Sequence, residues 1–153
     1  MKTLSRPFSR LDPGDPLRPW LPVTVGNPDT GQKVSAYALI DTGADACALP
    51  AYLAPMLGLR LKSGGVKRIS TGGGDTTAYS HRVSLELPED GYATGDIAID
   101  FMTGLTVPLL GVANFLSEFV LVVDYPRKRF SLTLRPGAVT QRPRPRKDLT
   151  DQG

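Results

Sequence analysis

Apolar and polar residues alternate along much of the chain in short runs, as expected for β-strands whose two faces meet different surroundings. Residues 20–25 (WLPVTV) and 33–40 (KVSAYALI) are two such runs, and the stretch GNPDTGQ between them predicts a turn. We therefore expect a hairpin here. A second hairpin is predicted near the carboxyl end, where residues 119–124 (FVLVVD) and 129–134 (RFSLTL) flank the turn YPRK.

The middle of the chain carries further predicted strands. Alternation continues over residues 76–87, and apolar runs follow at 96–101 (DIAIDF) and 105–111 (LTVPLLG). The segment 59–70 (LRLKSGGVKRIS) predicts a hairpin around its two glycines. Residues 49–59 (LPAYLAPMLGL) favour a short helix or an irregular loop, and 112–119 (VANFLSEF) favour a short helix. The pattern as a whole predicts an all-β chain.

Composition supports one β domain. The chain has 153 residues, of which 41% are hydrophobic, and its 16 glycines and 14 prolines are typical of many short elements joined by tight turns. We divide it into a proline-rich lead (1–18), a globular domain (19–135) and a tail (136–153). The net charge of +3 is unevenly spread, because residues 127–153 hold eight Lys and Arg against two Asp.

The basic tail has almost no apolar side chains, so burial cannot offset the entropy lost on ordering it, and we expect it to be disordered. A patch for nucleic acid or another polyanion is one interpretation, and a solvated appendage is the other. We favour the appendage, because only charge supports nucleic-acid binding.

Several classes of site are disfavoured by what the sequence contains. Cys47 is the single cysteine and His81 the single histidine, so neither a disulfide nor a Cys/His zinc site is expected, and no metal or cofactor is predicted. We expect Cys47 to pack as a small buried residue and His81 to be exposed and structural. No apolar run approaches the length of a membrane span, which predicts a soluble, cytoplasmic protein without a membrane partner.

The segment 38–50, ALIDTGADACALP, carries the most informative chemistry. Asp41 follows an apolar strand and precedes a glycine, so its carboxylate would lose hydration if the segment is buried. A surface turn is the alternative, since Asp and Gly both favour turns. The apolar residues before Asp41 favour a functional carboxylate, because charged groups in such settings usually serve a purpose.

Three stretches read together resemble the retropepsin family, the single-domain aspartic proteases of retroviruses and their cellular and bacterial relatives. ALIDTGA matches the family's Asp-Thr-Gly signature, STGGG lies where its glycine-rich flap should be, and VPLLGVANFL matches the apolar-apolar-Gly before its helix. The resemblance covers about residues 20–134. It implies a closed, mostly antiparallel acid-protease barrel with one short helix, one lobe per chain and a two-fold homodimer.

The resemblance also assigns roles around the signature. Asp41 would be catalytic, acting with Asp41 of a second copy as an aspartic endopeptidase on extended polypeptides, without a metal. Thr42 would brace the two loops, and Gly43 would let the backbone pass close to the two-fold axis. Ala44 and Asp45 would bind substrate. In retroviral members an arginine after the late glycine holds the equivalent of Asp45, whereas Val112, Ala113 and Asn114 occupy that stretch here.

Gly72, Gly73 and Gly74 would form the flap tip, where missing side chains allow close approach to a peptide. An ordinary loop is the alternative, because loops are commonly glycine-rich. The missing arginine and irregular flap leave a second function open: a catalytically weak or inactive dimer of the same fold that serves as a peptide-binding or assembly module.

Overall fold

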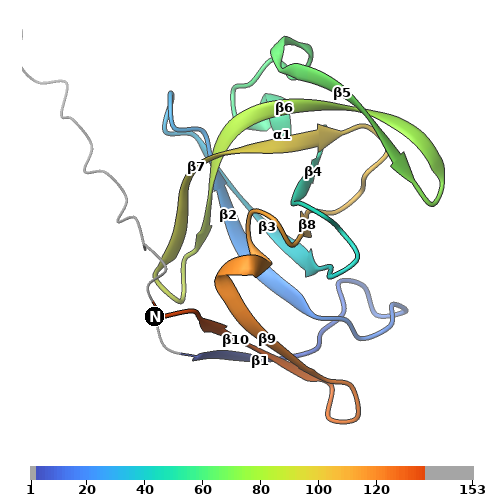
Figure 1. Cartoon of the computed structure of the whole chain (residues 1–153), viewed down its shortest axis with the longest axis vertical. Helices are drawn as coiled ribbons and strands as arrows, with labels where there is room; N and C mark the ends of the chain where they lie inside the picture. Colours follow the sequence, from blue (N-terminus) through green and yellow to red (C-terminus); the bar gives the residue numbers. More distant parts are fainter. Residues whose placement is uncertain (1–2, 137–153) are drawn as a thin grey trace, which may run out of the picture.

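The computed structural model describes residues 3–136, and almost every element in this part of the chain is a strand (Figure 1). The only α-helix among these residues is α1 (Leu53–Met56), and two short 3-10 turns, η1 and η2, complete the helical elements. The elements in chain order are β1 (Thr3–Pro7), β2 (Trp20–Gly26), β3 (Lys33–Ile40), β4 (Ala48–Pro50), α1, η1 (Leu61–Ser63), β5 (Gly65–Thr71), β6 (Gly74–Leu87), β7 (Tyr92–Met102), β8 (Leu109–Leu110), η2 (Leu116–Glu118), β9 (Phe119–Asp124) and β10 (Arg129–Leu134).

Six strands close into a barrel in the order β2-β3-β8-β4-β7-β6, because β6 also pairs with β2. The all-β, closed-barrel prediction is therefore confirmed. Most neighbours are antiparallel, but β8 runs parallel to β3 and β4 runs parallel to β7. Strand β5 lies outside this ring and pairs with β6 alone. Because the ring is closed, none of its six strands is a free edge, whereas β5 outside the ring has one side unpaired among the described strands.

A three-stranded sheet, β1-β10-β9, lies beside one end of the barrel (Figure 1). Strands β9 and β10 form the hairpin predicted from FVLVVD and RFSLTL, and β2 and β3 form the hairpin predicted nearer the amino end. Strand β1 was not expected, because residues 1–18 were assigned to a lead. Its Leu4 is buried, so the sheet gains both backbone pairing and apolar burial from this segment.

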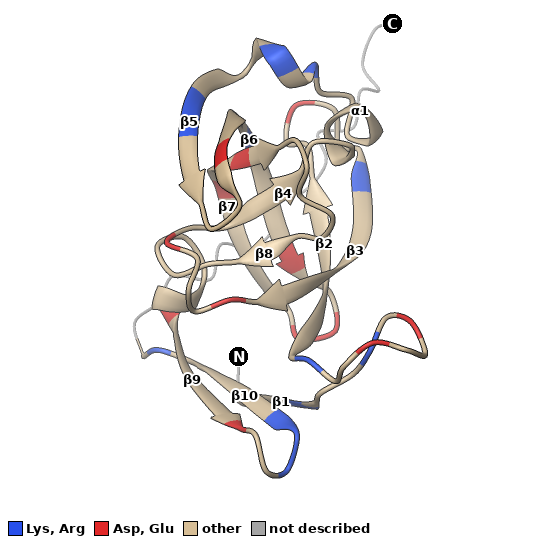
Figure 2. Ribbon diagram, turned by 90° about the vertical axis from the view of Figure 1, so that its right-hand side faces the viewer, with Lys and Arg blue, Asp and Glu red and all other residues tan. Residues whose placement is uncertain are grey.

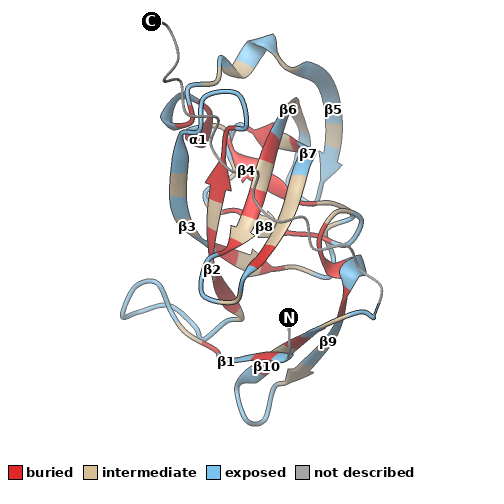
Figure 3. Cartoon of the chain, turned by 90° about the vertical axis from the view of Figure 1, so that its left-hand side faces the viewer, coloured by how far each residue is buried: buried red, intermediate tan, exposed pale blue. Residues whose placement is uncertain are grey.

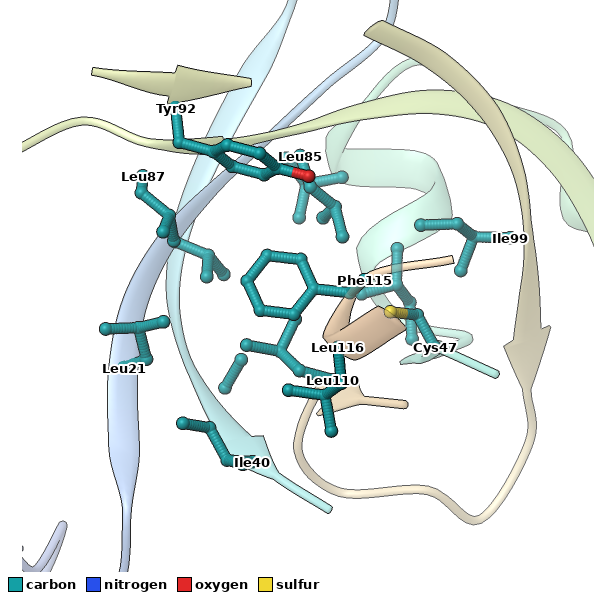
Figure 4. Close-up of a cluster of buried hydrophobic side chains, with 14 of the residues drawn as sticks. Leu21, Ile40, Cys47, Leu85, Leu87, Tyr92, Ile99, Leu110, Phe115 and Leu116 are labelled. Carbon is teal, nitrogen blue, oxygen red and sulfur yellow. The ribbon is translucent and has the colours of Figure 1, made fainter. Parts of the chain in front are cut away.

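One continuous hydrophobic core fills the barrel and extends under the three-stranded sheet (Figure 3). Inward-facing residues alternate along β2, where Leu21, Val23 and Val25 are buried. Phe115 lies in the middle of the cluster drawn in Figure 4, and its ring meets that of Tyr92 edge to face, with centroids 5.8 Å apart. Burying such a side chain contributes roughly 1.5–3 kcal/mol.

Two local predictions were wrong. Residues 59–70 do not fold back on themselves: Leu61–Ser63 form η1, and β5 pairs instead with β6 along its whole length. The predicted helix over 112–119 shortens to the single 3-10 turn η2, because Phe115 and Leu116 are drawn into the core and β9 begins at Phe119. Within residues 3–136 no helix is long and apolar enough to cross a membrane.

Candidate active site

Asp41 lies where β3 leaves the barrel. Strand β3 runs parallel to β8, with Ile40 opposite Leu110, and the next backbone N–H, that of Asp41, donates to the Leu110 carbonyl at 3.1 Å. Ile40 is buried and Asp41 is only partly exposed. The apolar strand thus delivers a carboxylate to the end of the barrel, as the sequence predicted.

Residues 41–47, here called the Asp41 loop, turn sharply after this carboxylate. The Gly43 N–H donates to Oδ1 of Asp41 at 2.9 Å, and the Ala44 N–H donates to the Asp41 carbonyl at 3.2 Å. A Cβ at position 43 would lie 3.2 Å from Oδ1 of Asp41, closer than most such contacts. Glycine therefore leaves room for the carboxylate to accept the backbone hydrogen bond. Thr42 and Gly43 are exposed at the tip.

The segment that follows β8 holds the Asp41 loop in place. The backbone N–H of Val112 donates to the Ala44 carbonyl at 3.0 Å, and that of Ala113 donates to the Asp45 carbonyl at 2.7 Å. Gly111 is buried against the loop so closely that a Cβ there would clash with the backbone of Ala46. The late glycine of the sequence motif is thus required by space.

Asn114 is a site residue that sequence reasoning missed. Its side-chain Oδ1 accepts the backbone N–H of Cys47 at 2.7 Å, which joins the last residue of the Asp41 loop to the chain after β8. A polar residue shortly after an apolar-apolar-Gly run was the available signal. None of the ion pairs between described residues includes Asp45, whose side chain is exposed. The loop is braced through its backbone instead.

Cys47 lies beneath the loop and is 2% exposed, in agreement with its predicted role as a small buried residue. Its Sγ accepts the Gly111 N–H at 3.4 Å. Burial raises the pKa of the thiol from 9.0 to about 11, against a smaller lowering by the Gly111 hydrogen bond. The thiol is therefore neutral at ordinary pH and has no nucleophilic character there.

The three predicted flap glycines lie at the tip of the β5–β6 hairpin. Thr71 pairs with Gly74 across a two-residue turn made of Gly72 and Gly73. Gly74 has φ +110°, a backbone conformation that strongly favours glycine. The Thr71 hydroxyl donates to the Gly74 carbonyl at 2.7 Å, so the turn is closed by its own side chain. No residue of the turn carries an apolar side chain.

The hairpin tip and the Asp41 loop lie on the same side of the molecule. Figure 1 and the view turned by 90° in Figure 2 both show the β5–β6 turn beside the loop between β3 and β4. The structure thus gathers the two predicted groups of site residues, from positions 41–45 and 72–74. His81 lies outside these two groups. It was expected to be exposed, but it is half-buried, and its ring hydrogen-bonds to the Leu61 carbonyl.

Residues 3–136 contain no group of three His, Cys, Asp or Glu side chains placed to hold a metal ion. Asp41 has a hydrogen-bonded oxygen and a partly exposed setting, which suits a group that exchanges a proton with a substrate or water.

Sequence comparison agrees with this geometry. The model of the family described as aspartyl protease matches residues 21–111, which span β2 to the end of β8 and include the whole Asp41 loop and the flap. The chain belongs to the aspartyl protease family. No curated protein matches the sequence.

Solved structures place this aspartyl protease family member in the retropepsin-like fold. A retropepsin-like aspartic protease from Rickettsia conorii is similar with a TM-score of 0.67 at 20% identity, covering 86% of this chain and 99% of that one. The retroviral protease-like domain of Ddi1 from Leishmania major has a TM-score of 0.51 at 17% identity, covering 76% and 93%. At such identities the likeness concerns the fold.

Proposed function

We propose that this protein is an aspartic endopeptidase whose active site is shared between two copies of the chain. The observation that carries the proposal is Asp41, presented at the end of a buried strand with Oδ1 held by the Gly43 N–H at 2.9 Å, in a chain of this family. The sequence contains two Asp-Thr-Gly triplets, but the one at 29–31 lies in the exposed turn between β2 and β3, and only the one at 41–43 directly follows a buried strand. The second carboxylate of the site would therefore come from Asp41 of a second copy.

Two Asp41 carboxylates facing one another would share a single proton, because like charges in a poorly solvated site repel. The ionised member takes a proton from water, which attacks the scissile carbonyl, while the protonated member donates a hydrogen bond to the carbonyl oxygen. The proton then passes to the leaving nitrogen. The pair titrates as a unit, and no covalent intermediate forms.

The remaining site residues either support the two Asp41 loops or bind the substrate. Gly43 stabilises the ionised form of Asp41 through its N–H, and Thr42 at the exposed tip of the loop braces the partner loop. Ala44 and Asp45 line the path of an extended polypeptide. The Gly72–Gly73 turn lies over this path, where the absence of side chains lets its backbone approach the peptide.

The test compares the parent protein with Asp41→Asn on a peptide library at several pH values. The asparagine keeps the volume and the acceptor for the Gly43 N–H but cannot exchange a proton, so we expect at least a 10³-fold loss of hydrolysis. Unfolding of both proteins in urea provides the control and is expected to coincide closely. Equal hydrolysis by both proteins would remove Asp41 from the mechanism.

A second candidate is a peptide-binding or assembly module with little turnover. It is favoured by the exposed Asp45, which has no ion-pair partner among the described residues, and by a flap turn without apolar side chains. The same library separates the two functions. Peptides that bind the parent protein and remain intact after long incubation would favour the module.

A further inference from the structure

The β5–β6 hairpin joins the barrel through one strand. Strand β5 pairs only with β6, while the second half of β6 continues into the barrel wall, where it pairs with β2 and β7. The pairing of β5 begins at Gly65, opposite Ser80. We call the region where this pairing begins the base of the hairpin. The direction of the hairpin relative to the barrel depends on the contacts made there.

His81 lies at the base, next to Ser80 on β6. Its Nε2 is 2.7 Å from the Leu61 carbonyl in η1, the turn that immediately precedes β5. A carbonyl can only accept, so Nε2 carries the proton and donates it. The imidazole also meets the ring of Phe101 edge to face, with centroids 5.4 Å apart and planes at 90°. The buried core of the barrel thus orients the donor.

Gly64 shows how closely η1 is held against β6 at this point. A Cβ on Gly64 would clash with the Ser80 carbonyl and would lie 2.7 Å from Nε2 of His81. The φ of Gly64 is −73°, which any residue can adopt, so the glycine is required by space alone. The backbone before β5 and the imidazole are in direct contact.

An ion pair a short way along β5 also joins the hairpin to the barrel. Lys67 of β5 reaches across β6 to Asp100 of β7, with Nζ 2.9 Å from Oδ1. Beyond it, the side-chain hydrogen bonds recorded for described tip residues stay within the hairpin, except that the Thr76 hydroxyl donates to the Thr103 carbonyl at 3.3 Å. An apolar contact also holds the hairpin, because Ala78 of β6 is buried with Ala48 and Met102. Ile69 of β5 packs against the same cluster. The hairpin is therefore positioned by this cluster together with the contacts at its base.

We propose that His81 is a positioning residue for the flap: its Nε2–H bond to Leu61 sets the angle at which the β5–β6 hairpin leaves the barrel. The part of this inference that concerns substrate rests on the proposed function, in which the Gly72–Gly73 turn covers the bound peptide. A flap set at the wrong angle would weaken substrate binding more than it would slow the chemistry at Asp41.

The experiment compares His81→Leu, which removes the donor, with His81→Gln, whose amide N–H can reach the same carbonyl. Hydrogen exchange is followed by mass spectrometry over peptides from the hairpin and from the barrel. In His81→Leu we expect exchange over residues 65–80 to rise about three- to tenfold, as for the loss of one hydrogen bond. KM for a cleaved peptide is expected to rise by a similar factor with kcat within twofold, and His81→Gln to restore both.

Two further variants serve as a control and as an independent approach. Asp96→Asn breaks the exposed Arg82–Asp96 pair beside His81, away from η1, and should leave the hairpin's exchange unchanged. Gly64→Ala introduces a Cβ that would clash with the Ser80 carbonyl, so it should push η1 away from β6 and reproduce the His81→Leu pattern. Exchange that rises equally over the barrel, or nowhere, in His81→Leu would overturn the proposal. Exchange needs no substrate, so this outcome is independent of whether the protein cleaves peptides.

Discussion

Folding changes the protonation of the Cys47 thiol, which lies beside the candidate active site. Burial beneath the Asp41 loop holds its pKa at about 11, two units above the ordinary 9.0. The unfolded chain therefore loses this proton at a lower pH than the folded chain. The corresponding stability is complete below about pH 9 and is lost as pH rises toward 11.

We expect the free energy of unfolding to fall by about 2 kcal/mol more between pH 8 and 11 in the parent than in Cys47→Ala. Urea denaturation at a series of pH values measures both slopes. Tyr92, whose pKa is raised to about 12 chiefly by burial and further by the charges of Glu118 and Cys47, weakens both proteins in the same direction as pH rises. Parallel slopes would mean that Cys47 is not held neutral by the fold.

At the scale of elements, β1 is the strand whose presence differs most from the prediction made from sequence. It pairs with β10 over five residues and inserts Leu4, which is 3% exposed, into the common core. Arg6 on the same strand binds Asp90 at 3.1 Å and Glu89 at 3.2 Å in the β6–β7 turn. These contacts fasten the three-stranded sheet to the barrel.

Leu4→Ala should therefore cost about 2–5 kcal/mol of unfolding free energy, as for other buried leucines. Ser5→Ala, an exposed neighbour on the same strand, should change it by less than about 0.5 kcal/mol. Both values come from urea titration. If residues 1–18 were a separate lead, the two substitutions would behave alike.

At the scale of the whole molecule, the proposed mechanism requires two chains for each active site. Of the two Asp-Thr-Gly triplets in the sequence, the one at 29–31 lies in the exposed β2–β3 turn, so the dyad would be completed by Asp41 of the second copy. Assembly depends on protomer concentration, so activity per chain should decline on dilution as dimers separate.

Mixing gives a sharper measurement of the shared site. Parent protein titrated with excess Asp41→Asn chains should lose activity beyond simple dilution, because each mixed dimer has one ionisable carboxylate in place of two. Mass measured during the titration reports subunit exchange and guards against a dimer too tight to separate. Full activity in a species of monomer mass would contradict the shared site.

Much of the site could be predicted because short stretches of sequence specify it. The apolar run before Asp41, the glycine two residues later and the three consecutive glycines at 72–74 each encode a strand end or a turn by their own conformational preferences. Asn114 could not be found in this way. Its partner, the Cys47 N–H, lies 67 positions away along the chain.

The boundaries of the domain at residue 19 and residue 135 stay predictions, and the disordered tail expected at 136–153 lies almost wholly outside the described residues. The structure does record that β1 and the barrel share a core. Local pattern missed β1 because a five-residue strand with one apolar side chain before its terminal Pro7 has little alternation to reveal it.

Sequence by itself determined most of the strand-forming segments, most of the turns and the position of Asp41, since alternation and turn chemistry act between neighbouring residues. Tertiary structure alone decided which strands pair. It set β5 against β6 instead of a local hairpin, closed the ring through β2 and β6, and drew Phe115 out of a helix into the core. Those outcomes depend on burial and backbone pairing between distant segments, which no short stretch of sequence contains.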